Sequence, residues 1–202
     1  MIRKWVFLPT KCLARIALSP FFAIRSHGLE HIPLSRGFIL LPKHQRWTDI
    51  PLLSLAAGRP IYYVAKKELF DSPLTRWYLK SLGGIPLDRS RPVRSKDSFK
   101  KIHEILKAAG GIVVFPEGTY YPEEMGPVRH GMIRFLLRRG DVPFIPTGIR
   151  YARGLFRTKV YIAFGEPIWR RNHSSDGDFI EEIRFRIASL SEVPLRRMNR
   201  ND

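Results

Sequence analysis

Short apolar runs alternate with segments of helical periodicity along most of this chain of 202 residues. We predict that the runs 38–41, 61–64 and 112–115 are buried strands. Residues 73–82 and 99–109 have helical spacing, and a pair of glycines closes each of these segments. Strands that alternate with helices predict an α/β fold, and we expect a single layered domain with a central mixed sheet flanked by helices.

The same reading divides the chain into three parts. We expect residues 28–193 to form the domain, with later strands at 144–149 and 160–164 and a last amphipathic helix after them. Residues 1–27 are expected to be a basic amphipathic segment ahead of the domain. Residues 194–202 are expected to be a frayed basic tail.

A histidine and an aspartate follow the first predicted strand. Their separation of five residues puts His44 and Asp49 on different sides of a helix and on opposite faces of a strand. They meet only if the chain turns between them, and Thr48 or Asp49 as an N-cap, with Pro51 in the first helical turn, predicts such a turn. A carboxylate that holds an imidazole in one tautomer leaves its other nitrogen free to act as a base. An ordinary loop histidine beside an N-cap aspartate would show the same pattern.

Two further strand ends carry unusual side chains. Arg89 follows the predicted strand at 85–87, where a guanidinium could hold phosphate oxygens, although a surface arginine paired with Asp88 would fit equally. The strand at 112–115 runs into a carboxylate, a flexible glycine and a hydroxyl: Glu117, Gly118 and Thr119. An ordinary solvated turn would also use these residue types.

The formal net charge of +17 implies an anionic partner, which can be nucleic acid, anionic lipid or a phosphorylated substrate. The sequence has no zinc-finger pattern, helix-turn-helix signal or aromatic RNA-binding motif, so nucleic-acid binding is the remote alternative. Cys12 is the only cysteine, which excludes an intramolecular disulfide and a zinc site built on paired cysteines.

The first 27 residues contain no run of the ~18 apolar residues that cross a membrane. Lys11 and Arg15 share one side of a helix there, while Leu13 and Ile16 lie away from them. Such a segment is typical of a helix in the membrane interface. A helix packed on the domain fits the pattern equally, and the two interpretations are compatible.

Taken in order and spacing, these blocks resemble the 1-acylglycerol-3-phosphate acyltransferase family of glycerolipid synthesis. That family is marked by N-H-x-x-x-x-D, G-x-x-x-x-x-R, F-P-E-G-T and V-P-x-x-P blocks, which read here KHQRWTD, GGIPLDR, FPEGT and VPFIP. The resemblance runs from about Leu29 to Pro167. Lys43 stands where the family usually has asparagine, and Tyr120 stands where it usually has arginine. Arg129 could take the place of that arginine.

The resemblance implies transfer of a fatty acyl group from acyl-CoA or acyl carrier protein to the free hydroxyl of a lysophospholipid. The acceptor it implies is lysophosphatidic acid, 1-acylglycerol 3-phosphate, and the product is phosphatidic acid. His44 would be the general base and Asp49 would orient it. The absence of a G-x-S-x-G elbow favours direct attack without an acyl-enzyme.

The resemblance implies that the glycerol phosphate end of the acceptor is held by Arg89 and by the turn of Glu117, Gly118 and Thr119. We add Arg129 to these binding residues as the stand-in for the arginine that Tyr120 replaces. Glu117 is anionic, so we expect it to act by fixing a neighbouring arginine or backbone amide. We expect no metal and no cofactor beyond the acyl donor, and we interpret His103 and His130 as structural.

Other acceptors remain open because of Tyr120: glycerol 3-phosphate or another lysophospholipid. A protein of the same fold that binds lipid without turnover is a further alternative. The amphiphilic substrate and the basic first segment lead us to expect a peripheral protein on the cytoplasmic face of the cell membrane, bound to an anionic surface.

Overall fold

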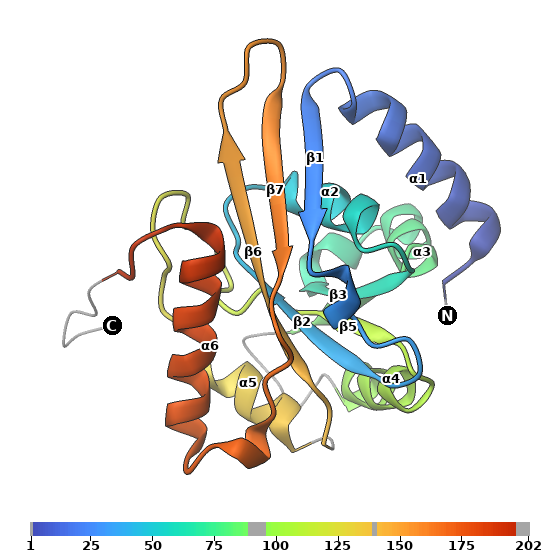
Figure 1. Ribbon diagram of the computed structural model, residues 1–202. Coiled ribbons are helices and arrows are strands. Elements are labelled where there is room, and N and C mark those ends of the chain that lie inside the picture. The colour runs from blue at the N-terminus through green and yellow to red at the C-terminus, as the bar shows by residue number, and fades with distance from the viewer. Residues whose placement is uncertain (1, 89–95, 139–140, 197–202) are drawn as a thin grey trace.

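The structure is a computed structural model that describes residues 2–88, 96–138 and 141–196 (Figure 1). Its centre is a seven-stranded sheet with the strand order β1-β7-β6-β2-β5-β3-β4. The strands are β1 Phe22–His27, β2 Phe38–Pro42, β3 Ile61–Lys66, β4 Gly84–Leu87, β5 Gly111–Val113, β6 Phe144–Ala152 and β7 Thr158–Phe164. Neighbouring strands are parallel except β6 and β7, which form an antiparallel hairpin. The sheet is therefore mixed, as the sequence predicted.

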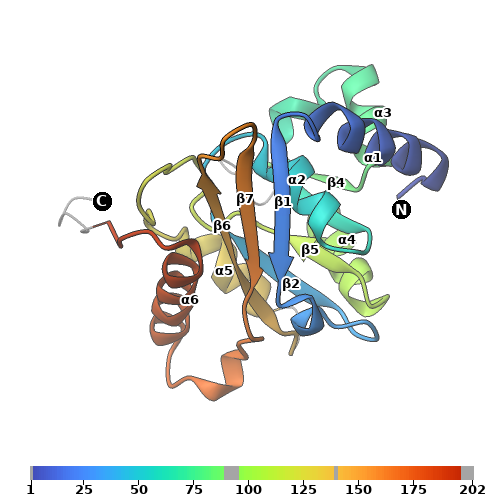
Figure 2. The same cartoon turned by 45° about the horizontal axis from the view of Figure 1, so that its top comes forward.

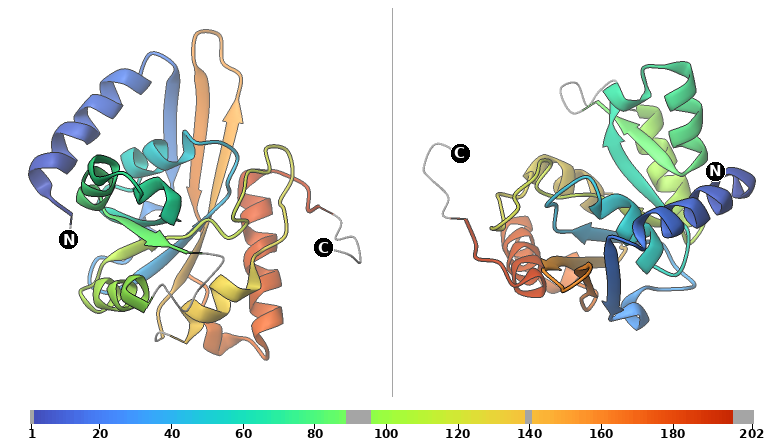
Figure 3. Two further views of the ribbon diagram at one scale, coloured as in Figure 1. Left: turned by 180° about the vertical axis from the view of Figure 1, so that it is seen from behind. Right: turned by 90° about the horizontal axis from the view of Figure 1, so that it is seen from above.

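Helices cover both faces of this sheet (Figure 3). The α-helices are α1 Lys4–Leu18, α2 Asp49–Ala56, α3 Pro73–Ser81, α4 Lys96–Lys107, α5 His130–Leu137 and α6 Asp176–Ser191. Short 3₁₀ helices include Leu29–His31, Lys67–Phe70 and Arg170–Asn172. One apolar cluster joins α4, α5 and α6 to one face of the sheet, and a second joins α2 to the other face.

The packing of the central strand β2 explains why its sequence is continuously apolar. Ile39 and Leu41 belong to the cluster under α4, α5 and α6, whereas Phe38 and Leu40 belong to the cluster under α2. All four are completely buried. A strand that is covered on both faces needs apolar side chains at every position and not at alternate ones.

The carboxyl ends of β2, β3, β4, β5 and β6 lie at one edge of the sheet because these strands all run in one direction. The loops that follow β2 and β5 therefore meet at this edge, although about 70 residues separate them in the sequence. The β6–β7 hairpin extends past this edge and projects from the body of the molecule (Figure 1).

Two predictions about the ends of the domain were wrong. Phe38 was expected to begin the first strand, yet residues 22–27 form the edge strand β1, paired with β7. Three of its six residues are exposed and none is fully buried, so it lacks the apolar run of a central strand. Residues 194–196 were expected to fray, but the amide of Met125 donates to the carbonyl of Pro194 and the amide of Arg196 donates to the carbonyl of Met125.

The helix α1 packs against the domain along one side only. Its residues Val6 and Phe7 are buried against the domain, and its Thr10 accepts a hydrogen bond from Tyr78 of α3. Its outer side carries apolar residues that are 60% to 67% exposed: Trp5, Leu8, Leu13 and Ile16. Within the described ranges, no helix combines the length and the apolar character needed to cross a membrane.

Candidate active site

His44 and Asp49 meet across the turn between β2 and α2. The Nδ1 atom of His44 lies 3.0 Å from Oδ2 of Asp49. The same carboxylate oxygen accepts the backbone N–H groups of Gln45 at 2.6 Å and Arg46 at 2.9 Å. Asp49 therefore closes the turn with its own side chain, whereas Thr48, the alternative cap, makes no capping hydrogen bond. This contact assigns the proton of the neutral ring to Nδ1 and leaves Nε2 as an acceptor.

The second oxygen of the aspartate is held by a residue that the sequence did not reveal. The hydroxyl of Tyr151 on β6 donates to Oδ1 of Asp49 at 2.6 Å. Burial, together with the charge of Asp49, raises the pKa of Tyr151 above its usual value, so the phenol stays protonated and remains a donor. The guanidinium of Arg46 lies 4.1 Å from the centre of the Tyr151 ring. No local pattern could identify Tyr151, because it lies 102 residues from its partner.

Two aromatic rings contact the imidazole of His44. The ring of Phe115 stacks on it with centroids 3.8 Å apart, and the ring of Tyr120 is tilted against it at 4.4 Å. The His44 side chain keeps 12% of its surface exposed, while Asp49 is fully buried. Tyr120, which stands where an arginine is usual, therefore contacts the proposed base.

Glu117 lies beneath this site and not in its opening. It is 2% exposed and accepts the backbone N–H groups of His44 and Gly126, both at 2.8 Å. Its cationic partner is Lys43, whose Nζ lies 2.7 Å from Oε1. The expectation that Glu117 fixes an amide agrees with this arrangement, but the neighbouring cation is a lysine and not an arginine. Glu117 thus ties the loop after β2 to the loop after β5.

Lys43 is completely buried, which the sequence did not predict. Besides Glu117, its ammonium donates to the carbonyl oxygens of Tyr121 at 2.6 Å and His44 at 3.3 Å. Burial lowers the pKa of Lys43 and raises the pKa of Glu117, and the attraction between the two opposes both shifts. In the sequence, Lys43 was visible only as a departure from the usual asparagine.

A cavity of about 430 Å³ opens at the loop that follows β5. Phe115, whose ring stacks on His44, forms part of its wall, and Gly118 and Arg129 also line it. Gly118 has a φ of 70°, and a Cβ atom there would lie 2.4 Å from Nε of Arg129. Only glycine therefore allows the arginine to lie across this turn.

Fewer contacts are known for the two remaining predicted binding residues, Thr119 and Arg89. Thr119 is exposed, next to Gly118. Arg89 lies outside the described residues, but Asp88, directly before it, lines the cavity. The structure thus brings His44 and Asp49 together, and it brings Gly118 and Arg129 together at the neighbouring cavity.

Comparisons with known proteins agree with this architecture. A model of the family described as Acyltransferase matches residues 23–150. The chain is 33% identical over 202 residues to the chloroplastic 1-acyl-sn-glycerol-3-phosphate acyltransferase of Arabidopsis thaliana, a match that covers 95% of this chain and 55% of the relative. It is 28% identical over 186 residues to the 1-acyl-sn-glycerol-3-phosphate acyltransferase of Bacillus subtilis, covering 89% of this chain and 88% of the relative.

The fold is also similar to a solved structure. The crystal structure of the 1-acyl-sn-glycerophosphate acyltransferase PlsC from Thermotoga maritima superimposes with a TM-score of 0.74 and 26% identity, over 94% of this chain and 80% of that one. This likeness and the family match confirm the predicted fold class and the resemblance drawn from the sequence motifs. The chain spans little more than half the length of the Arabidopsis relative. It belongs to the acyltransferase family.

Proposed function

We propose that this protein transfers a fatty acyl group from a thioester donor to the free hydroxyl of lysophosphatidic acid, forming phosphatidic acid. The observation that carries the proposal is the pair of His44 and Asp49, 3.0 Å apart, with Phe115 stacked on His44 and forming part of the wall of a cavity that Arg129 also lines. The names of the relatives from Arabidopsis, Bacillus and Thermotoga support the choice of acceptor.

In the proposed mechanism, Nε2 of His44 removes the proton of the acceptor hydroxyl as its oxygen attacks the thioester carbonyl. A carbon–oxygen bond forms, the carbon–sulfur bond breaks, and the proton passes to the leaving thiolate. Asp49 holds the ring and stabilises the imidazolium that forms during the attack. General base catalysis supplies roughly 10²–10⁴-fold. Positioning of the two substrates and donors to the developing oxyanion supply the rest.

The acceptor is proposed to enter the cavity beside Phe115. Its phosphate would meet Arg129, the turn at Gly118 and Thr119, and Arg89, since guanidinium groups match phosphate oxygens with paired donors. Glu117 supports this turn from beneath through the amides of His44 and Gly126. The acyl donor is acyl-CoA or acyl carrier protein, and both are anionic partners for a chain of charge +17.

A membrane surface is part of the same proposal. The outer side of α1 is apolar and Lys4, Lys11 and Arg15 lie along its margin, which suits a helix lying in the interface of an anionic bilayer. We therefore propose a peripheral protein on the cytoplasmic face of the cell membrane, which takes its lysophospholipid acceptor from that surface.

The test is turnover of purified variants, with products identified by mass spectrometry. His44→Ala is expected to fold and to show turnover near background, and Asp49→Asn is expected to lose most of the rate. His103→Ala, which changes a half-buried histidine on α4, is the matched control and is expected to retain activity. Near-normal turnover by folded His44→Ala would falsify the role of the base. Acceptors in the assay include lysophosphatidic acid, glycerol 3-phosphate and other lysophospholipids, each with both donor types.

A further inference from the structure

We propose that the tip of the β6–β7 hairpin, residues 153–157, inserts into the lipid bilayer as a second membrane anchor beside α1. This inference rests on the proposed function, because it extends the membrane contact of the same protein. Leu155 and Phe156 at the tip are 89% and 90% exposed, the highest values among the large apolar side chains of the described residues. The hairpin carries them beyond the edge of the sheet (Figure 1).

Apolar side chains from two other segments lie at the same end of the molecule. Phe21, in the turn before β1, is 64% exposed, and its carbonyl accepts the amide of Thr158 at 2.9 Å. Trp47, three residues after His44, is 66% exposed. These two residues and the hairpin tip border one hollow of about 730 Å³. A contiguous exposed apolar patch of this kind marks an interaction surface.

Basic side chains surround the apolar tip. Arg153 and Arg157 flank Leu155 and Phe156, and Arg46 lies across the same hollow. No aspartate or glutamate is found among the described residues that line the hollow. Arg157 also donates to the carbonyl of Ser19 at 3.1 Å, which joins the hairpin to the end of α1.

This combination fits an anionic bilayer better than an acidic protein. Apolar side chains at a projecting tip gain free energy by entering the acyl region, while the arginines behind them remain at the level of the phosphate groups. An acidic protein partner, such as a carrier protein, would account for the arginines. It would not account for two apolar side chains that project into solvent.

The two anchors together determine how the enzyme lies on the membrane. The exposed side of α1 and the hairpin tip are joined by the turn at Phe21, and Figures 1 and 2 both show this turn beside the hairpin tip. Tyr151 lies two residues before the tip, and its hydroxyl donates to Asp49. Trp47 lies in the loop between His44 and Asp49 and borders the same hollow as the tip. Insertion of the tip therefore brings His44 close to the surface from which a lysophospholipid would be taken.

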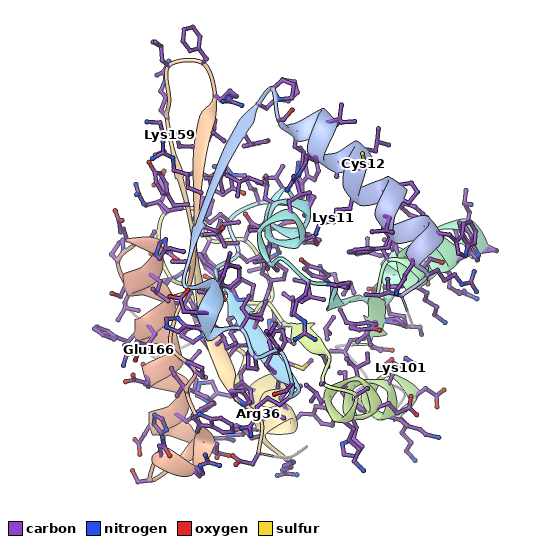
Figure 4. All side chains as sticks on the ribbon, turned by 45° about the vertical axis from the view of Figure 1, so that its right-hand side comes forward. Lys11, Cys12, Arg36, Lys101, Lys159 and Glu166 are labelled. Carbon is purple, nitrogen blue, oxygen red and sulfur yellow. The ribbon has the colours of Figure 1, made fainter. Side chains whose placement is uncertain are left out.

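The single cysteine of the chain makes the insertion directly measurable. Cys12 is exposed on α1 (Figure 4), and Cys12→Ser removes it. Phe156→Cys in that background accepts an environment-sensitive fluorophore at the tip. Leu34→Cys provides the matched control, because Leu34 is 83% exposed and precedes β2 at the opposite end of the sheet. Each fluorophore-labelled protein is mixed with vesicles of phosphatidylcholine and phosphatidylglycerol that contain nitroxide-labelled lipid.

We expect a blue shift and lipid quenching for the label at position 156, and neither for the label at position 34. Absence of quenching at position 156 on vesicle-bound protein would overturn the proposal, and so would a failure of the full-length protein to bind these vesicles at low salt. Because quenching is a binding measurement, it is independent of turnover. A protein that inserts its hairpin but transfers no acyl group would refute the proposed function alone.

A second pair of variants tests the energetics. Leu155→Ser combined with Phe156→Ser is expected to lower the vesicle partition coefficient by about tenfold or more, the effect of removing large apolar side chains from a buried environment. Leu34→Ser combined with Phe185→Ser removes two exposed apolar side chains elsewhere and is expected to leave partitioning unchanged. The tip variant should lose more turnover on vesicle-embedded acceptor than on detergent-dispersed acceptor. Normal vesicle binding with a loss confined to the carrier-protein donor would identify a protein partner and contradict the proposal.

Discussion

Replacing Lys43 by methionine tests whether the two motif loops depend on the buried ion pair between them. Lys43→Met keeps most of the length of the side chain but removes the ammonium that lies 2.7 Å from Glu117. Both side chains are completely buried, so water cannot take over the role of the lysine. The variant leaves an anionic carboxylate in the interior, and among the described residues only the amides of His44 and Gly126 then donate to it.

The expected loss is large because breaking a buried pair costs more than the pair itself contributes. Removing one partner of such a pair typically costs about 3–5 kcal/mol of unfolding free energy. For a chain of this size each kcal/mol lowers the melting temperature by about 2–4 °C, so a fall of roughly 6–20 °C is expected. The matched control is Lys101→Met, which removes an exposed pair with Glu104 at 3.6 Å. Exposed pairs contribute less than about 1 kcal/mol.

The measurement is thermal and urea unfolding followed by circular dichroism. Burial raises the pKa of Glu117, so folding favours its protonated form and the contribution of this group to stability is lost as pH rises through the folded pKa. Without Lys43 the folded pKa rises further. The difference in stability between wild type and Lys43→Met should therefore shrink as the pH is lowered toward the usual range of a carboxyl group. Adding Glu117→Gln removes the unpaired charge and should restore part of the loss at neutral pH.

A Lys43→Met protein as stable at neutral pH as the Lys101→Met control would refute the reasoning. So would a stability difference between wild type and Lys43→Met that does not depend on pH. If the double variant were less stable than Lys43→Met alone, the uncompensated charge of Glu117 would not be the cause of the loss.

Two further predictions concern the site itself. Tyr151→Phe removes the hydroxyl that donates to Asp49 but keeps the ring, so kcat is expected to fall by roughly ten- to hundredfold, the range of a hydrogen bond to a charged group, with KM unchanged. A change in KM alone would argue against a role in positioning the aspartate. Arg129→Ala is expected to reduce the specificity constant for a phosphorylated acceptor by about tenfold and to affect an acceptor without phosphate much less. Arg134→Ala, an exposed arginine on α5, is the control, and an equal loss on both acceptors for Arg129→Ala would exclude a phosphate contact.

Several elements were predictable because their signals are local. The central strand β2 is apolar throughout, since both faces of the sheet are covered there, and helices such as α4 repeat their apolar residues with helical spacing. The turn between His44 and Asp49 was predictable for the same reason. A carboxylate at the start of a helix lies within a few residues of the amides and the ring that it holds.

Other elements depend on which strands become neighbours, and a local pattern carries no such information. β1 was missed because an edge strand with no fully buried residue has little apolar periodicity. The position of 194–196 depends on a backbone pairing with Met125 that no side-chain pattern encodes.

For the candidate site, the sequence by itself determined which two side chains meet: an imidazole and a carboxylate placed on either side of a strand-to-helix turn. Only the tertiary structure decided what surrounds them. Parallel pairing of β2 with both β5 and β6 brings Glu117 beneath Lys43 and Tyr151 against Asp49. The physical reason is that a buried charge needs partners within hydrogen-bonding distance, and in this fold strands far apart in the sequence supply them.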